Sequence, residues 1–120
     1  MSLLSQTKEI CQYLSIRPQK RFGQNFLIQK NTQDKIIRLA EIAPGDLVLE
    51  IGTGFGFLTK ALAKEASFVI TVEADKKILK FLASELKNLP NVELIEGDIL
   101  NEKTQEKLRG LLFKKDYKVV

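Results

Sequence analysis

A glycine-rich turn between a strand and a helix constrains the fold of this chain more than any other feature. Residues 47–51 are a short apolar run suited to a buried parallel strand, and Gly-Thr-Gly-Phe-Gly follows at residues 52–56. Apolar residues at helical spacing then run from Phe57 to Leu62. Glycine turns the backbone sharply and admits a ligand with no Cβ in the way, and the helix start beyond offers free N–H groups. This unit is typical of sites for adenosine-containing cofactors.

The alternation of strand and helix continues through the rest of the sequence. Further strands are predicted at residues 68–72, ending at Glu73, at 92–95, and at 117–120, where the chain stops. Helices are predicted near 78–86 and 101–113. The alternation predicts βαβ units in one α/β domain with a parallel sheet. Because the fourth strand has only begun when the chain stops, we expect a fragment of a longer protein.

The N-terminal segment differs from this body in pattern and in charge. A helix is predicted near residues 3–14, a loop at 17–26, and a helix from an N-cap at Asn31 to about residue 43. That helix should turn Ile36, Ile37, Leu39 and Ala40 inward. Residues 1–38 hold seven basic and two acidic side chains, whereas residues 39–120 hold twelve and thirteen. This excess of basic side chains is typical of a segment that binds a polyanion, and equally of a solvated arm.

The composition excludes several kinds of chemistry. The chain contains no histidine and a single cysteine, Cys11, so Ser–His and Cys–His pairs, histidine-ligated metals and a disulfide framework are ruled out. We therefore expect no metal site. No apolar run approaches the roughly 20 residues of a membrane span, and no signal peptide is evident, so we expect a cytoplasmic protein.

The spacing of the glycines and acids narrows the choice of cofactor. The Gly-x-Gly-x-x-Gly fingerprint of dinucleotide sites fails, because its last position falls on Phe57. Glu73 ends the second strand 21 residues after Gly52, where a carboxylate can accept hydrogen bonds from both ribose hydroxyls. Asp98 follows the third strand, where it can accept a hydrogen bond from an adenine amino group. We expect the three strand ends to surround one adenosyl group.

Two motifs together resemble a known family. Gly-Gln-Asn-Phe-Leu at residues 23–27, followed by Val-Leu-Glu-Ile-Gly-x-Gly-x-Gly from Val48, is similar to the ribosomal RNA adenine dimethyltransferases, most of all the bacterial small-subunit (16S) branch. The resemblance covers residues from about 18 to 120. It implies a Rossmann-like class I S-adenosylmethionine-dependent methyltransferase fold, and N6-dimethylation of two adjacent adenosines in small-subunit RNA. The implied partner is the immature small ribosomal subunit, and the full-length enzyme is expected to be a monomer.

The resemblance also implies roles for individual residues. The cofactor would be contacted by Asn25, Leu27, Gly52, Gly54, Glu73 and Asp98, with Gln24 and Glu50 nearby. RNA phosphates would be held by Lys20 and Arg21, within an N-terminal helix and basic loop spanning residues 1–30. The chain departs from the family at Thr53, where proline is frequent. The family's catalytic Asn-Leu-Pro-Tyr motif would begin just after Val120, and its C-terminal helical domain is absent, so we expect this fragment to be inactive by itself.

Three alternatives remain open. Macrolide-resistance methylases, which modify adenine N6 in large-subunit RNA, share the fold and much of the N-terminal loop. A non-catalytic RNA-binding module could keep the same fold. A nicotinamide-dependent oxidoreductase is the weakest alternative, because the dinucleotide spacing fails.

Overall fold

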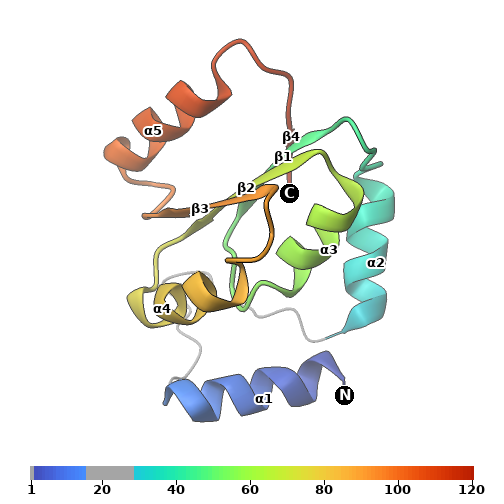
Figure 1. Cartoon of the computed structure of the whole chain (residues 1–120), viewed down its shortest axis with the longest axis vertical. Helices are drawn as coiled ribbons and strands as arrows, with labels where there is room; N and C mark the ends of the chain where they lie inside the picture. Colours follow the sequence, from blue (N-terminus) through green and yellow to red (C-terminus); the bar gives the residue numbers. More distant parts are fainter. Residues whose placement is uncertain (1, 16–28) are drawn as a thin grey trace.

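The computed structural model describes residues 2–15 and 29–120, and its centre is a parallel sheet (Figure 1). The strands are β1 (Leu47–Ile51), β2 (Phe68–Glu73), β3 (Val92–Glu96) and β4 (Lys118–Val119), and they lie in the order β3-β2-β1-β4. All three pairings are parallel. The parallel α/β sheet predicted from the sequence is therefore confirmed.

Helices cover both faces of the sheet. They are α1 (Leu3–Leu14), α2 (Lys30–Leu39), α3 (Phe57–Glu65), α4 (Lys76–Glu85) and α5 (Glu102–Leu112). Helices α2, α3 and α4 lie on one face, α1 packs against the outside of α4, and α5 lies on the other face (Figure 1). Among the described residues, no helix is long and apolar enough to span a bilayer.

The strands divide the core by simple alternation. In β1, Val48 faces α3 and packs with Leu62, whereas Leu49 faces α5 and packs with Leu108. Side chains on a strand point alternately to the two faces, so strands covered on both sides must be apolar throughout. This explains why Leu47–Ile51 and Phe68–Glu73 are mostly apolar, with Glu50, Thr71 and Glu73 as the exceptions.

The change of helix face fixes where a ligand can bind. The crossovers through α3 and α4 lie on one face and the crossover through α5 lies on the other, so the topology reverses between β1 and β4. Beside β1, the N–H of Val120 donates to the carbonyl of Leu49 at 2.9 Å. In open α/β sheets, ligands bind beyond the carboxyl ends of the strands at this reversal.

Helix α2 differs from its prediction at both ends. Its N-cap is Gln29, whose backbone is extended, and Asn31 lies inside the helix, so the predicted N-cap was wrong. The helix ends at Leu39 rather than near residue 43, and Glu41 follows with a left-handed φ of 52°. Leu39 is 70% exposed, so its predicted inward orientation was also wrong.

Candidate functional site

The carboxyl ends of β1, β2 and β3 meet at one edge of the sheet. The N–H of Gly52 donates to the carbonyl of Val72 at 2.9 Å, which joins the end of β1 to β2. The N–H of Gly97 donates to the carbonyl of Glu73 at 2.9 Å, which joins the turn after β3 to β2. Asp98 follows Gly97 directly, so the glycine turn, the glutamate and the aspartate expected from the sequence are brought to one edge.

The glycine turn needs glycine at its three alternate positions for conformational reasons. Gly52, Gly54 and Gly56 have φ values of 85°, 58° and 84°, which L side chains rarely adopt. Among the described residues, no atom would lie within 4 Å of a Cβ placed on Gly52, which leaves space above it for a ligand. A Cβ on Gly56 would lie 3.3 Å from the side chains of Leu82 and Leu86, so that glycine serves close packing against α4.

The carboxylate of Glu73 fixes the conformation of this edge. One oxygen, Oε1, accepts from the N–H of Gly54 at 2.9 Å. The other, Oε2, accepts from the N–H groups of Ala74 at 3.0 Å and Asp75 at 2.9 Å. A carboxylate has about four acceptor positions, so one remains on Oε1. Glu73 is buried, and this one position is fewer than the two that hydrogen bonds from both ribose hydroxyls would need.

A second carboxylate lies beneath the turn. Glu50 Oε1 accepts from the hydroxyl of Thr71 at 2.7 Å and from the hydroxyl of Thr59. Burial raises the pKa of Glu50 to about 7; the two threonine hydroxyls oppose this rise and the charge of Glu73 adds to it. Glu50 therefore lies at the junction of β1, β2 and α3, and not in the open space above Gly52.

Thr53 is anchored to β2 in a way that proline could not be. Its N–H donates to the carbonyl of Val72 at 3.2 Å, and its hydroxyl lies 2.6 Å from the hydroxyl of Thr71. The single proton of Thr71 goes to Glu50, so Thr53 donates in this pair. Proline lacks both the N–H and the hydroxyl, so two hydrogen bonds here take the place of proline's rigid φ.

Asp98 lies on the solvent-exposed side of this edge of the sheet. It is exposed, and its Oδ1 accepts from the N–H of Leu100 at 2.9 Å. The turn before it is tight, because a Cβ on Gly97 would lie 2.2 Å from the hydroxyl oxygen of Thr104. The other predicted site residues, Lys20, Arg21, Gln24, Asn25 and Leu27, lie outside the described residues.

Sequence reasoning missed the polar partners of Glu50 and the role of Phe55. Phe55 is 2% exposed, and its ring meets the ring of Phe81 edge-to-face with centroids 6.0 Å apart. A glutamate inside an apolar strand is a signal that polar partners must exist, but their positions depend on how β2 and α3 pack. Across residues 2–15 and 29–120, no three metal-ligating side chains cluster.

The family model and the curated relatives that match this chain agree with one another. The family model described as ribosomal RNA adenine dimethylase matches residues 16–120. A curated relative from Pelotomaculum thermopropionicum, ribosomal RNA small subunit methyltransferase A, is 48% identical over 94 residues, which are 78% of this chain and 32% of that protein. The chain spans about a third of the length of the curated relatives that it matches first.

Two solved structures share the arrangement of strands and helices. The 23S rRNA methyltransferase ErmE superposes with a TM-score of 0.60 at 39% identity, covering 64% of this chain and 32% of that one. A dimethyladenosine transferase from Plasmodium falciparum gives a TM-score of 0.59 at 35% identity, covering 64% of this chain and 29% of that one.

Proposed function

The chain belongs to the ribosomal RNA adenine dimethylase family, and on that premise we propose that it is the cofactor-binding part of a 16S rRNA adenine N6-dimethyltransferase. This enzyme would use S-adenosylmethionine to dimethylate adjacent adenosines of small-subunit RNA. The convergence of three strand ends at one edge, joined through Val72 and Glu73, is the observation that carries the proposal. The relatives' length supports the proposal that this chain is the N-terminal part of the methyltransferase domain, with the catalytic motif in sequence beyond Val120.

Each strand end has a proposed role toward the cofactor. Gly52 and Gly54 would lie against its methionine and ribose portions, since the space above Gly52 is open. Glu73 would accept from the ribose with the acceptor position left on Oε1. Asp98, exposed at the rim, would accept from the adenine amino group. Asn25 and Leu27 would close the site from the N-terminal loop.

The proposed reaction places few chemical demands on this part of the chain. When bound, S-adenosylmethionine supplies an electrophilic methyl group. The adenine N6 is a weak nucleophile because its lone pair is delocalised into the ring. Catalysis then rests on holding the amine in line with the methyl group. The target base would leave its stack to reach that position. Lys20 and Arg21 would hold RNA phosphates, so binding should weaken as salt rises.

Titration calorimetry with S-adenosylhomocysteine tests the cofactor part of this proposal. The protein that carries this chain should release or absorb heat with one-site stoichiometry. No detectable binding would instead favour the non-catalytic RNA-binding module on the same fold.

Transfer of labelled methyl groups tests the substrate. With unmethylated small subunits, the protein that carries this chain together with the sequence beyond Val120 should incorporate four methyl groups, two on each adenosine. The 120-residue chain alone should transfer none. Turnover by residues 1–120 alone would contradict our placement of the catalytic motif.

A second candidate is methylation of adenine N6 in large-subunit RNA. The similarity to the 23S rRNA methyltransferase ErmE, at 39% identity, favours it. The same transfer assay on separate large and small subunits distinguishes the two. We expect label in the small subunit, because the curated relative at 48% identity bears a small-subunit name.

A further inference from the structure

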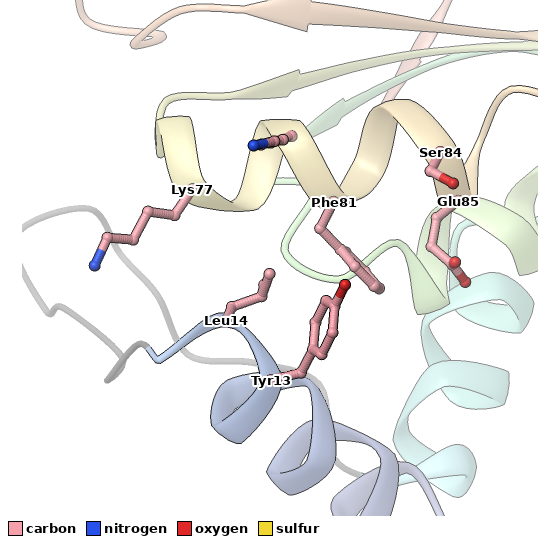
Figure 2. Close-up of a pocket in the computed structure, with 7 residues that line it drawn as sticks. Tyr13, Leu14, Lys77, Phe81, Ser84 and Glu85 are labelled. Carbon is pink, nitrogen blue, oxygen red and sulfur yellow. The ribbon is translucent and has the colours of Figure 1, made fainter.

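A hollow between α1 and α4 is lined by none of the residues that end β1, β2 and β3, and it has its own chemistry. Its volume is about 600 Å³, and it is lined by Tyr13, Leu14, Lys77, Lys80, Phe81, Ser84 and Glu85. Figure 2 shows the rings of Tyr13 and Phe81 directed into the same space, with Lys77 at one end and Ser84 and Glu85 at the other. The hollow therefore combines two aromatic rings with two cations.

The ring of Tyr13 presents stacking surface that the fold does not use, whereas the ring of Phe81 also contacts Phe55. Tyr13 is 82% exposed although it lies near the end of α1, where its neighbours Cys11 and Leu14 pack toward α4. Phe81 is half-buried. An exposed ring opposite a half-buried ring is the arrangement on which unstacked bases are held in single-strand binding proteins.

The charges of the hollow favour an anion. Glu85, the one acid among the described residues that line the hollow, is paired with Lys60 at 2.7 Å. Among the described residues, no acid forms an ion pair with Lys77 or Lys80. Both lysines are exposed, so their charges are available to phosphates at the mouth of the hollow.

The hollow is next to the cofactor edge. Phe81 contacts Phe55 edge-to-face, and Phe55 lies within the glycine turn between Gly54 and Gly56. Helix α4 begins at Lys76, three residues after Glu73. A strand seated in the hollow would therefore lie near the edge where the methyl group is proposed to be transferred.

We propose that the hollow between α1 and α4 binds a single-stranded segment of the RNA substrate. One base stacks between Tyr13 and Phe81, and neighbouring phosphates lie on Lys77 and Lys80. This proposal rests on the proposed function, because it assumes that RNA is the substrate. A membrane surface would need a continuous apolar patch, and here the aromatic rings are interleaved with lysines and a serine.

Fluorescence anisotropy with a labelled, unstructured RNA of about ten nucleotides tests the proposal. Tyr13→Ala should weaken binding by about tenfold, because base–aromatic stacking is lost, whereas Tyr13→Phe should keep the wild-type affinity. Lys77→Gln with Lys80→Gln should weaken binding and reduce the slope of log K against log salt by about 1.4 if each holds one phosphate.

A matched control removes the same charge elsewhere. Lys103→Gln with Lys107→Gln acts on exposed residues of α5, on the opposite face of the sheet, and should leave the affinity much closer to wild type. In the 120-residue chain stacking can also be seen directly, because these residues include two tyrosines and no tryptophan. In a Tyr117→Phe background, RNA should quench the emission of Tyr13.

Three results would overturn the proposal. They are unchanged affinity in Tyr13→Ala, equal losses in the α4 and α5 lysine pairs, or a Tyr13→Ala change that alters only self-association in sedimentation. Calorimetry with S-adenosylhomocysteine keeps the two proposals separate. A hollow variant that loses RNA binding but still binds S-adenosylhomocysteine bears on the hollow alone. An unaltered protein that does not bind S-adenosylhomocysteine contradicts the proposed function.

Discussion

At the scale of single residues, Glu73 connects the glycine turn to the start of α4. Its carboxylate accepts from three backbone N–H groups and is proposed to accept from the ribose as well. Glu73→Gln places an amide NH₂ group against at least one of those N–H donors. We expect a loss of about 2 kcal/mol in the free energy of unfolding and at least tenfold weaker cofactor binding.

Urea denaturation and calorimetry with S-adenosylhomocysteine measure the two effects separately. Glu106→Gln is the matched control, since Glu106 is exposed on α5 and the same charge is removed. Cofactor affinity that stays at the wild-type level in folded Glu73→Gln would remove the ribose role and leave Glu73 as a structural residue.

Glu50 should make stability depend on pH in the opposite direction from an ion-paired acid. Its pKa is raised from an ordinary value of 4.5 to about 7 in the folded chain, first of all by burial. The folded state therefore binds more protons than the unfolded state between these two values. The free energy of unfolding should fall as pH rises from about 4.5 to about 7, by about 3 kcal/mol in total.

Glu50→Gln isolates this contribution. A glutamine oxygen can still accept from the hydroxyls of Thr59 and Thr71, and it carries no charge at any pH. The variant should match the wild type near pH 4.5 and exceed its stability at pH 8, as measured by urea denaturation across that range. Parallel pH profiles for the two proteins would show that burial does not shift this group.

The sequence predicted which residues gather at the site better than it predicted what they contact. Gly52, Glu73 and Asp98 could be placed at one edge because parallel strands end at the same side. The three amide donors to Glu73 could not be foreseen, since they depend on the path of the backbone after β2. Their roles toward a cofactor stay predictions.

At the scale of elements, the turn from β3 into α5 depends on the absence of a side chain at Gly97. A Cβ there would lie 2.2 Å from the hydroxyl oxygen of Thr104 and 3.2 Å from its Cβ. Thr104 is buried on α5, so it has little room to move. Gly97→Ala should destabilise the chain by about 1–3 kcal/mol in urea denaturation.

Gly110→Ala is a matched glycine-to-alanine control in the same region. A Cβ at Gly110, inside α5, would meet nothing within 4 Å, so this change should stabilise by about 0.5–1 kcal/mol. In the double variant, Thr104→Ala should recover part of the stability that Gly97→Ala loses, because it removes the clashing hydroxyl. Equal effects of the two glycine changes would show that the contact with Thr104 is unimportant.

Element boundaries were predicted best where the core or a side-chain cap enforces them, as in β1 and at Ser2 before α1. The strand at residues 47–51 and the helix at 3–14 have the predicted bounds. Helix α2 was predicted least well, because none of its residues is fully buried and Gln29 caps it without a side-chain hydrogen bond. Exposed helix ends are decided by small energies that the hydrophobic pattern does not contain.

At the scale of the whole molecule, strand β4 is paired along one edge only within residues 2–15 and 29–120. Among the described residues its partner is β1, and Val119 is 60% exposed. A hollow of about 340 Å³ lies near it, lined in part by Leu108, Leu112 and Tyr117. An open edge beside apolar surface promotes pairing between chains.

We expect the 120-residue chain to self-associate as its concentration rises, and Val119→Lys to oppose this. A lysine on an edge strand disfavours pairing with another edge. Sedimentation velocity over a range of concentrations measures the effect. Leu39→Lys is the control, because Leu39 is also largely exposed but lies on α2. A concentration-independent sedimentation coefficient for the unaltered chain would contradict this expectation.

The sequence predicted the parallel sheet but not the order of its strands. Alternating strands and helices are compatible with several orders, and β3-β2-β1-β4 follows from which face each helix takes. That choice is made by packing: α5 lies over Leu49 and Ile95, whereas α3 lies over Val48 and Val69. The central strands β1 and β2 have apolar residues on both faces, so the pattern alone does not distinguish the faces.

The three backbone N–H groups that donate to Glu73 hold the glycine turn in its conformation before a ligand binds. Because the glycine backbone is already ordered, little of a ligand's binding free energy would be lost in ordering it. Rearrangement of the glycine turn should therefore not limit the rate at which the cofactor binds.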